Sequence, residues 1–161
     1  MPERKLEPVK MEDITIVLRN FEGRPSKFNP PGTRNFGVLL DPRVAEAMMT
    51  DGWNVKHFKP REDDDEGDDT EPQAWLPVEV AYNKGRPPRI IMLTETERKN
   101  LTEHTVELMD GVDIKTVDVI VNPHYWENNG RSGVKAYLQT MYVTIEEDDL
   151  DRKYAQHGAH E

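Results

Sequence analysis

The chain has 161 residues, of which 35% are hydrophobic and 32% charged, and its formal net charge is −10. This length suits one domain with tails, and no apolar run approaches the about 20 residues that a membrane helix needs. The N-terminal sequence MPERKLEPVK lacks the apolar segment of a signal peptide. Cysteine is absent, which excludes disulfides, thiol catalysis and the usual zinc fingers. These features favour a cytoplasmic protein with no membrane partner, and we expect no cofactor and no metal.

The negative charge is concentrated in two short runs. Residues 62–71, EDDDEGDDTE, hold eight acids and no base, and residues 146–151, EEDDLD, hold five more. Without these thirteen carboxylates the formal charge changes from −10 to +3. Runs of like charge are usually solvated loops or tails. We therefore expect a flexible N-terminus over 1–10, a domain over 11–145 with a disordered acidic loop over 62–73, and an acidic and polar C-terminal tail over 146–161.

The first third of the chain contains two strand-like segments. Residues 11–20 include ITIVLR, whose alternation predicts a strand with Leu18 among its inward side chains. Residues 21–33 have three prolines and two glycines and indicate a loop. Residues 35–40 alternate again, with Phe36 on the apolar side. Arg34 stands where the loop meets this second strand.

A short helix follows the second strand. Asp41 is a good N-cap and Pro42 suits the first helical position, where a missing N–H costs nothing. The sequence ends the helix at Gly52, since glycine tolerates the left-handed conformation there. The expected apolar stripe of this helix consists of Val44, Ala45, Met48 and Met49.

A third strand is predicted over residues 53–58. Its alternation points Trp53 inward and places Lys56 and Phe58 together on the opposite side, with Lys59 just beyond. A cation beside an aromatic ring suits a single nucleic-acid strand, because bases stack on rings and phosphates bind cations. A strand whose solvent face happens to carry Lys and Phe is the plainer interpretation of the same pattern.

The remaining chain adds more strands. Residues 75–82 and 89–93 predict a hairpin with Lys84, Arg86 and Arg89 at its tip. Residues 115–122 and 134–145 predict two further strands, separated by the turn sequence NNG with Arg131 beside it. The apolar parity of the last strand switches near Gln139, which predicts a β-bulge.

Strands dominate this pattern, and the connections resemble hairpins. We therefore predict a mainly β fold: an OB-like antiparallel barrel with one helix between strands, long hairpin loops and an acidic C-terminal tail. A doubly wound parallel sheet would need several crossover helices, and the sequence predicts only one helix.

At this point the chain resembles a known family. The stretches FNPPGTRNFGVLL, DGWNVK, GRPPRI and GVKAYLQTMYVTIEEDDLDRKYA resemble a group of bacteriophage single-stranded DNA-binding proteins with an OB-fold. The resemblance covers about residues 21–155 and implies a protein that coats single-stranded DNA during phage replication or recombination in the host cell cytoplasm. It also implies an acidic tail that recruits replication or recombination proteins, here residues 146–151. The sequence departs from such a tail because Arg152, Lys153 and Tyr154 follow the acids.

This interpretation assigns the site to aromatic and basic side chains on the barrel face. Stacking discriminates weakly between bases and does not detect the 2′-OH, so we expect sequence-tolerant binding. For the same reason, the residues alone do not predict whether DNA or RNA is preferred. By parity Trp53 and Tyr82 belong to the core, and Phe36 also has inward parity. The candidate nucleic-acid-binding residues are Arg34, Phe36, Lys56, Phe58, Lys59, Trp75, Lys84, Arg86, Arg89, Tyr125, Trp126, Arg131, Lys135 and Tyr137.

Two other functions compete with this one. An acidic interaction protein, such as a DNA mimic that inhibits a host DNA-binding enzyme, would fit the net charge, although mimics spread their carboxylates over a folded surface. A metal-dependent nuclease would use carboxylates, but no spaced Asp/Glu/His set, Gly-rich phosphate loop or hydrolase motif is present. We therefore expect no catalytic residues.

Overall fold

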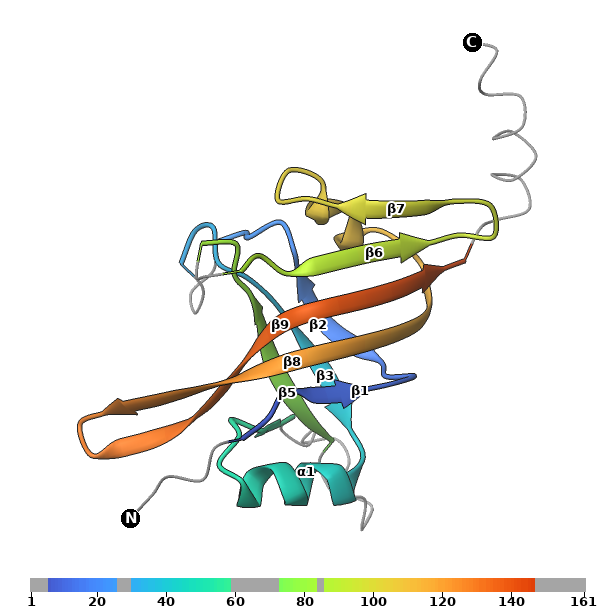
Figure 1. Ribbon diagram of the computed structural model, residues 1–161. Coiled ribbons are helices and arrows are strands. Elements are labelled where there is room, and N and C mark those ends of the chain that lie inside the picture. The colour runs from blue at the N-terminus through green and yellow to red at the C-terminus, as the bar shows by residue number, and fades with distance from the viewer. Residues whose placement is uncertain (1–5, 26–29, 59–72, 84–85, 147–161) are drawn as a thin grey trace, which may run out of the picture.

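The computed structural model describes residues 6–25, 30–58, 73–83 and 86–146, which form nine strands and two helices (Figure 1). The strands are β1 (Val9–Met11), β2 (Ile16–Asn20), β3 (Arg34–Leu40), β4 (Lys56–His57), β5 (Ala74–Val80), β6 (Arg89–Leu93), β7 (Arg98–Leu101), β8 (Ile114–Asn128) and β9 (Arg131–Ile145). The helices are α1 (Pro42–Thr50) and the 3₁₀ helix η1 (Val106–Asp110). Neither of these two helices is long and apolar enough to span a bilayer. Lys59, Lys84, the acidic run over 62–71 and the tail over 147–161 lie outside the described residues.

The strands form one mixed sheet around β9. The order is β1-β8-β9-β5-β3-β2, with β4 also paired to β5, and β6 paired to both β9 and β7. The predicted mainly β fold with one α-helix between strands is confirmed. The sheet is not antiparallel throughout, because β9 runs parallel to β5 and β6. Within the described residues its two end strands, β1 and β2, do not pair with each other, so the sheet stays open.

The predicted hairpin between β5 and β6 is wrong. β5 pairs in parallel with residues 136–137 of β9, and β6 pairs in parallel with residues 140–144 of the same strand. The two strands therefore run in the same direction, one after the other along the same edge of β9. The chain does not reverse its direction between them, as it would in a hairpin. Arg86 and Arg89 consequently do not stand at a hairpin tip.

The predicted bulge in β9 is confirmed at Gln139. Ile120 pairs with Thr140 whereas Val121 pairs with Leu138, which leaves Gln139 as the extra residue. The bulge shifts the alternation by one residue, so the whole strand keeps its apolar side chains on the core. The buried apolar residues of β9 on the two sides of the bulge are Val134, Ala136, Leu138, Met141 and Val143.

The core lies on the inner side of this curved sheet. Phe36 is 1% exposed and stacks on Phe21 with ring centroids 5.1 Å apart. Trp53 is also buried, and Tyr82 is partly buried against the core, in agreement with their parity. Alternation also predicted inward valines in β8, and these are buried as well, including Val119, the middle one.

The helix α1 lies at one end of β3 and β5 (Figure 1). The Asp41 carboxylate accepts a hydrogen bond from the Arg43 N–H at 2.8 Å, which confirms the predicted cap. Ala45 and Met48 are buried, but Val44 and Met49 are 43% and 50% exposed. The predicted four-residue stripe is thus half correct, because the helix covers only one end of the sheet.

Two segments near the N-terminus differ from expectation. β1 begins at Val9, inside the stretch for which we expected no regular structure, and pairs with β8. Leu18 was expected to point inward. A shift of register between Val17 and Asn20 and a φ of 53° at Leu18 turn this side chain outward, where it is 55% exposed.

Strands β8 and β9 extend beyond the rest of the sheet as a two-stranded arm (Figure 1). Asn129 and Gly130 form the connecting turn with φ values of 52° and 78°. Positive φ at both central residues is the geometry that an Asn-Gly hairpin turn provides. The predicted turn is therefore confirmed, and it places Arg131 at the end of the arm.

Candidate nucleic-acid interface

Trp75 is the centre of a cluster of candidate residues on the outer side of the sheet. The Phe58 ring stacks on its indole with centroids 5.6 Å apart and planes 22° apart. The Lys56 Nζ lies 5.9 Å from the centre of the same indole. The cluster forms because β4 pairs with β5 in a register that sets Lys56 opposite Trp75. A ring pair with a neighbouring cation is the combination that single nucleic-acid strands contact.

A depression of about 240 Å³ begins at this cluster and reaches β9. Lys56, Trp75 and Lys135 all line it, although they come from three different strands. Asn35, Asn54 and the acidic residue Glu79 are the other polar residues of its lining, and the outward-turned Leu18 forms part of its wall. The structure thus brings together residues that lie up to 117 positions apart in the sequence, from Leu18 to Lys135.

The arm carries a second set of candidate residues on the same side as Lys135. In the β8–β9 register, His124 is opposite Lys135 and Trp126 is opposite Gly133. Alternation puts Tyr137 on that side too, and its ring meets His124 edge-on at 5.0 Å. Arg131 has the same parity at the end of the arm.

We call this surface the stacking face. It combines rings and cations from β5, β8, β9, β4 and the residue that follows β4, on the outer side of the sheet, opposite the core. Its members are Lys56, Phe58, Trp75, His124, Trp126, Arg131, Lys135 and Tyr137.

Phe36 does not belong to the stacking face. Its ring is buried against Phe21, so it has no surface to offer a base, and its inclusion among the candidate residues was wrong. Its inward parity in β3 is the physical reason. The same alternation that made residues 35–40 recognisable as a strand directs this side chain into the core.

Arg34 lies apart from the stacking face, at the first residue of β3. Its guanidinium packs 5.5 Å from the centre of the Tyr82 ring, and its Nη1 is 3.8 Å from the Glu103 carboxylate. Burial raises the pKa of Tyr82, and the Arg34 charge opposes this rise while Glu103 adds to it. This group of side chains lines a polar cavity of about 310 Å³ together with Glu79.

The other candidates occupy separate positions. Arg86 is exposed just before β6 and Arg89 is exposed at its first residue, and neither is at a hairpin tip because β5 and β6 do not pair with each other. Tyr125 is on the opposite side of the arm from Trp126, and its hydroxyl accepts a hydrogen bond from the Leu6 N–H at 2.6 Å. Lys59 and Lys84 lie outside the described residues, so their positions relative to the stacking face stay predictions.

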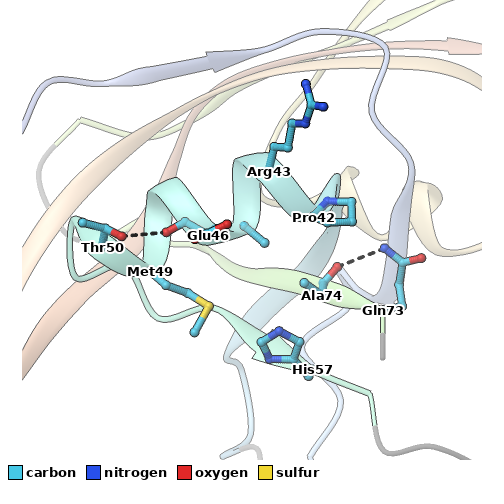
Figure 2. A pocket seen from close by; sticks show the side chains of 9 residues that line it. Pro42, Arg43, Glu46, Met49, Thr50, His57, Gln73 and Ala74 are labelled. Atoms are coloured by element: carbon cyan, nitrogen blue, oxygen red, sulfur yellow. Dashed lines mark hydrogen bonds between the residues drawn. The ribbon is translucent and has the colours of Figure 1, made fainter. Parts of the chain in front are cut away.

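A further cavity, of about 630 Å³, lies beside α1 (Figure 2). Met49 of the helix and His57 of β4 both border it. Glu46 also lines it, and the backbone carbonyl of Glu46 accepts a hydrogen bond from the Thr50 hydroxyl at 3.0 Å. No member of the stacking face lines this cavity. In the described part of the chain, no three His, Asp or Glu side chains gather in a way that could hold a metal ion.

Sequence reasoning missed four residues of this region. Leu18 was hidden by regular alternation, since no glycine marks the bulge that turns it outward. Asn35 and Asn54 carry no distinctive signal. His124 was recognisable only as the neighbour of two aromatic residues, and its place beside Tyr137 depends on the register of the arm.

Comparison with known families is consistent with this geometry. Residues 2–160 match the family model described as a putative phage ssDNA-binding domain. The chain belongs to this family. The match spans nearly the whole of this chain, so it includes both acidic runs, 62–71 and 146–151.

Solved structures share the fold of the domain. One is a C-terminal truncation of the single-stranded DNA-binding protein from bacteriophage Enc34, which is 11% identical to this chain with a TM-score of 0.53. The alignment covers 88% of this chain and 87% of the phage protein chain. The same phage protein in complex with ssDNA is 12% identical, also with a TM-score of 0.53, and 88% of each chain is covered. No curated protein sequence matches the chain.

Proposed function

We propose that this domain binds single-stranded DNA on the stacking face. Bases stack on Trp75, Phe58, Trp126 and Tyr137, while Lys56, Lys135 and Arg131 contact phosphates. The observation that supports this most strongly is the depression between β4, β5 and β9, which is lined by Lys56, Trp75 and Lys135 and in which the Lys56 ammonium lies 5.9 Å from the centre of the Trp75 indole. The solved relative in complex with ssDNA supports the same ligand class.

The chemistry of the face determines the mode of binding. Stacking of a base on an aromatic ring contributes about 1–3 kcal/mol and tolerates any base, because every base has a π-face. The three cations would neutralise about three phosphates, which gives a slope of log K against log salt of about −2 for a single strand. Binding on this surface is therefore sequence-tolerant and weakened by salt.

Titration of three fluorescent ligands tests the proposal. Oligo-dT, a duplex of the same length and a single-stranded RNA would each be titrated at two salt concentrations. We expect the single strands to bind more tightly than the duplex, with a negative salt slope. Equal or tighter binding of the duplex would overturn the proposal, and no binding together with inhibition of a DNA enzyme would favour an acidic DNA mimic. The RNA arm determines the preference at the 2′-OH.

The biological role follows from the ligand and the family. We infer that the domain protects or organises single-stranded DNA during phage replication or recombination in the host cytoplasm, without catalysing a reaction. We assign to the acidic run over 146–151 the binding of basic surfaces on replication or recombination proteins. Copurification of such proteins with the full chain, and not with a chain ending at Ile145, tests this role.

A further inference from the structure

Two glycines occupy strand interiors without a conformational reason. Gly37 lies in the middle of β3, and Gly133 lies near the start of β9. Neither belongs to the glycines with positive φ in the described residues. Glycine weakens a strand, because it loses more backbone entropy on folding and offers no side chain for packing. A strand glycine with ordinary backbone geometry therefore indicates that something approaches the backbone closely.

In both cases an indole makes that approach. A Cβ on Gly37 would lie 2.6 Å from Cε3 of Trp75, and a Cβ on Gly133 would lie 2.8 Å from Nε1 of Trp126. Both distances are well below van der Waals contact, so a side chain at either glycine would displace the ring. The third tryptophan, Trp53, is buried in the core and shows no such relationship.

The packing of Trp126 has a cost in hydrogen bonding. Its Nε1 is buried and has no hydrogen-bond partner within the described residues. A buried indole N–H normally finds an acceptor, and each exception calls for an explanation. Hydrogen bonding therefore does not explain why this ring lies across Gly133.

We propose that Gly37 and Gly133 are positioning residues for base stacking. By leaving room beneath the two indoles, they hold Trp75 and Trp126 against the sheet in the orientation that receives a base. This inference rests on the proposed function, and it adds how the stacking face is preorganised. A ring already held in place loses less side-chain freedom when DNA binds, so preorganisation increases affinity.

The test uses alanine variants and a matched glycine control. Gly37→Ala and Gly133→Ala add only a methyl group. Gly111→Ala adds the same group where a Cβ meets nothing within 4 Å and where φ is −115°. We expect oligo-dT affinity to fall about 3- to 10-fold for each of the first two variants, part of the contribution of one stacked base, and to stay unchanged for the control.

A double-mutant cycle separates positioning from folding. If Gly37 acts through Trp75, then Gly37→Ala will not weaken binding further when Trp75→Leu is already present, and the same holds for Gly133 with Trp126→Leu. These double variants also remove the clash between the added methyl group and the indole, and thermal melts select the variants that are folded. A further loss of affinity in the leucine background would overturn the proposal, as would alanine variants that bind like wild type.

Quenching of tryptophan fluorescence by acrylamide in the free protein gives a readout that needs no DNA. Displaced indoles become more accessible, so we expect stronger quenching in Gly37→Ala and Gly133→Ala than in Gly111→Ala. Unchanged quenching would overturn the positioning role. Failure of wild type itself to bind oligo-dT would instead refute the proposed function, and the two failures are therefore distinguishable.

Discussion

The Lys56 ammonium lies 5.9 Å from the centre of the Trp75 indole, across the β4–β5 pairing. This distance is within the range of a cation–π attraction. It also places a positive charge beside a surface on which a base can stack, so one nucleotide can meet both groups at once. The relationship exists because β4 and β5, which the acidic run separates in the sequence, pair in one register.

Trp75→Leu should weaken oligo-dT binding by about 5- to 150-fold, because stacking of one base contributes about 1–3 kcal/mol. Fluorescence anisotropy would measure the affinity, at a temperature where thermal melts show each variant folded. Tyr142→Leu provides the control, since Tyr142 is exposed on β9 beyond the bulge and outside the stacking face. Equal losses in the two variants would contradict the assignment of Trp75.

Lys135→Ala should reduce the magnitude of the salt slope by about 0.7, because one fewer phosphate is neutralised on a single strand. Affinity should fall most at low salt and converge with wild type as salt rises. Lys99→Ala removes the same charge from the exposed strand β7, away from the depression. If both lysine variants showed the same slope change, the effect would come from net charge and not from contact at Lys135.

The local part of the fold was predictable because side-chain periodicity depends on neighbouring residues. The cap at Asp41, the Asn-Gly turn and the bulge at Gln139 each have a signal within a few positions. The parallel connection from β5 to β6 has no such local signal. Its loop contains glycine and two prolines, as a turn does, and only pairing with the distant β9 makes the two strands parallel.

The same limit applies to the stacking face. Alternation correctly grouped Lys56 with Phe58 and Lys135 with Tyr137, since the members of each pair are two residues apart in an extended segment. It could not show that β4 and β9 both border β5, which brings Lys56 and Lys135 to one depression. Composition alone favoured Phe36 as a stacking residue, although its parity already pointed to the core.

Asp110→Ala should destabilise the domain by about 1–3 kcal/mol without changing its DNA affinity. The Asp110 carboxylate accepts hydrogen bonds from the Phe21 and Glu22 N–H groups at 2.8 and 2.9 Å. Removing it leaves backbone donors without a partner next to the buried Phe21 ring. Urea denaturation would measure the loss, with Asp113→Ala as a control at an exposed carboxylate nearby. A loss equal to that of the control would contradict this role.

Tyr82 should make the domain less stable at alkaline pH. Burial raises the pKa of its hydroxyl above the ordinary value of 10.0, and the Arg34 charge only partly offsets this. The folded state then keeps a proton that the unfolded chain releases, so the free energy of unfolding falls as pH rises through 10 and is unaffected at pH 7.

Tyr82→Phe removes this titration. At neutral pH it should cost little, because the Tyr82 hydroxyl has no hydrogen-bond partner in the described part of the chain. Urea midpoints between pH 8 and pH 11 should therefore decline less steeply for Tyr82→Phe than for wild type, whereas the exposed control Tyr142→Phe should follow wild type. Superimposable profiles for Tyr82→Phe and wild type would show that the buried hydroxyl does not carry the alkaline sensitivity.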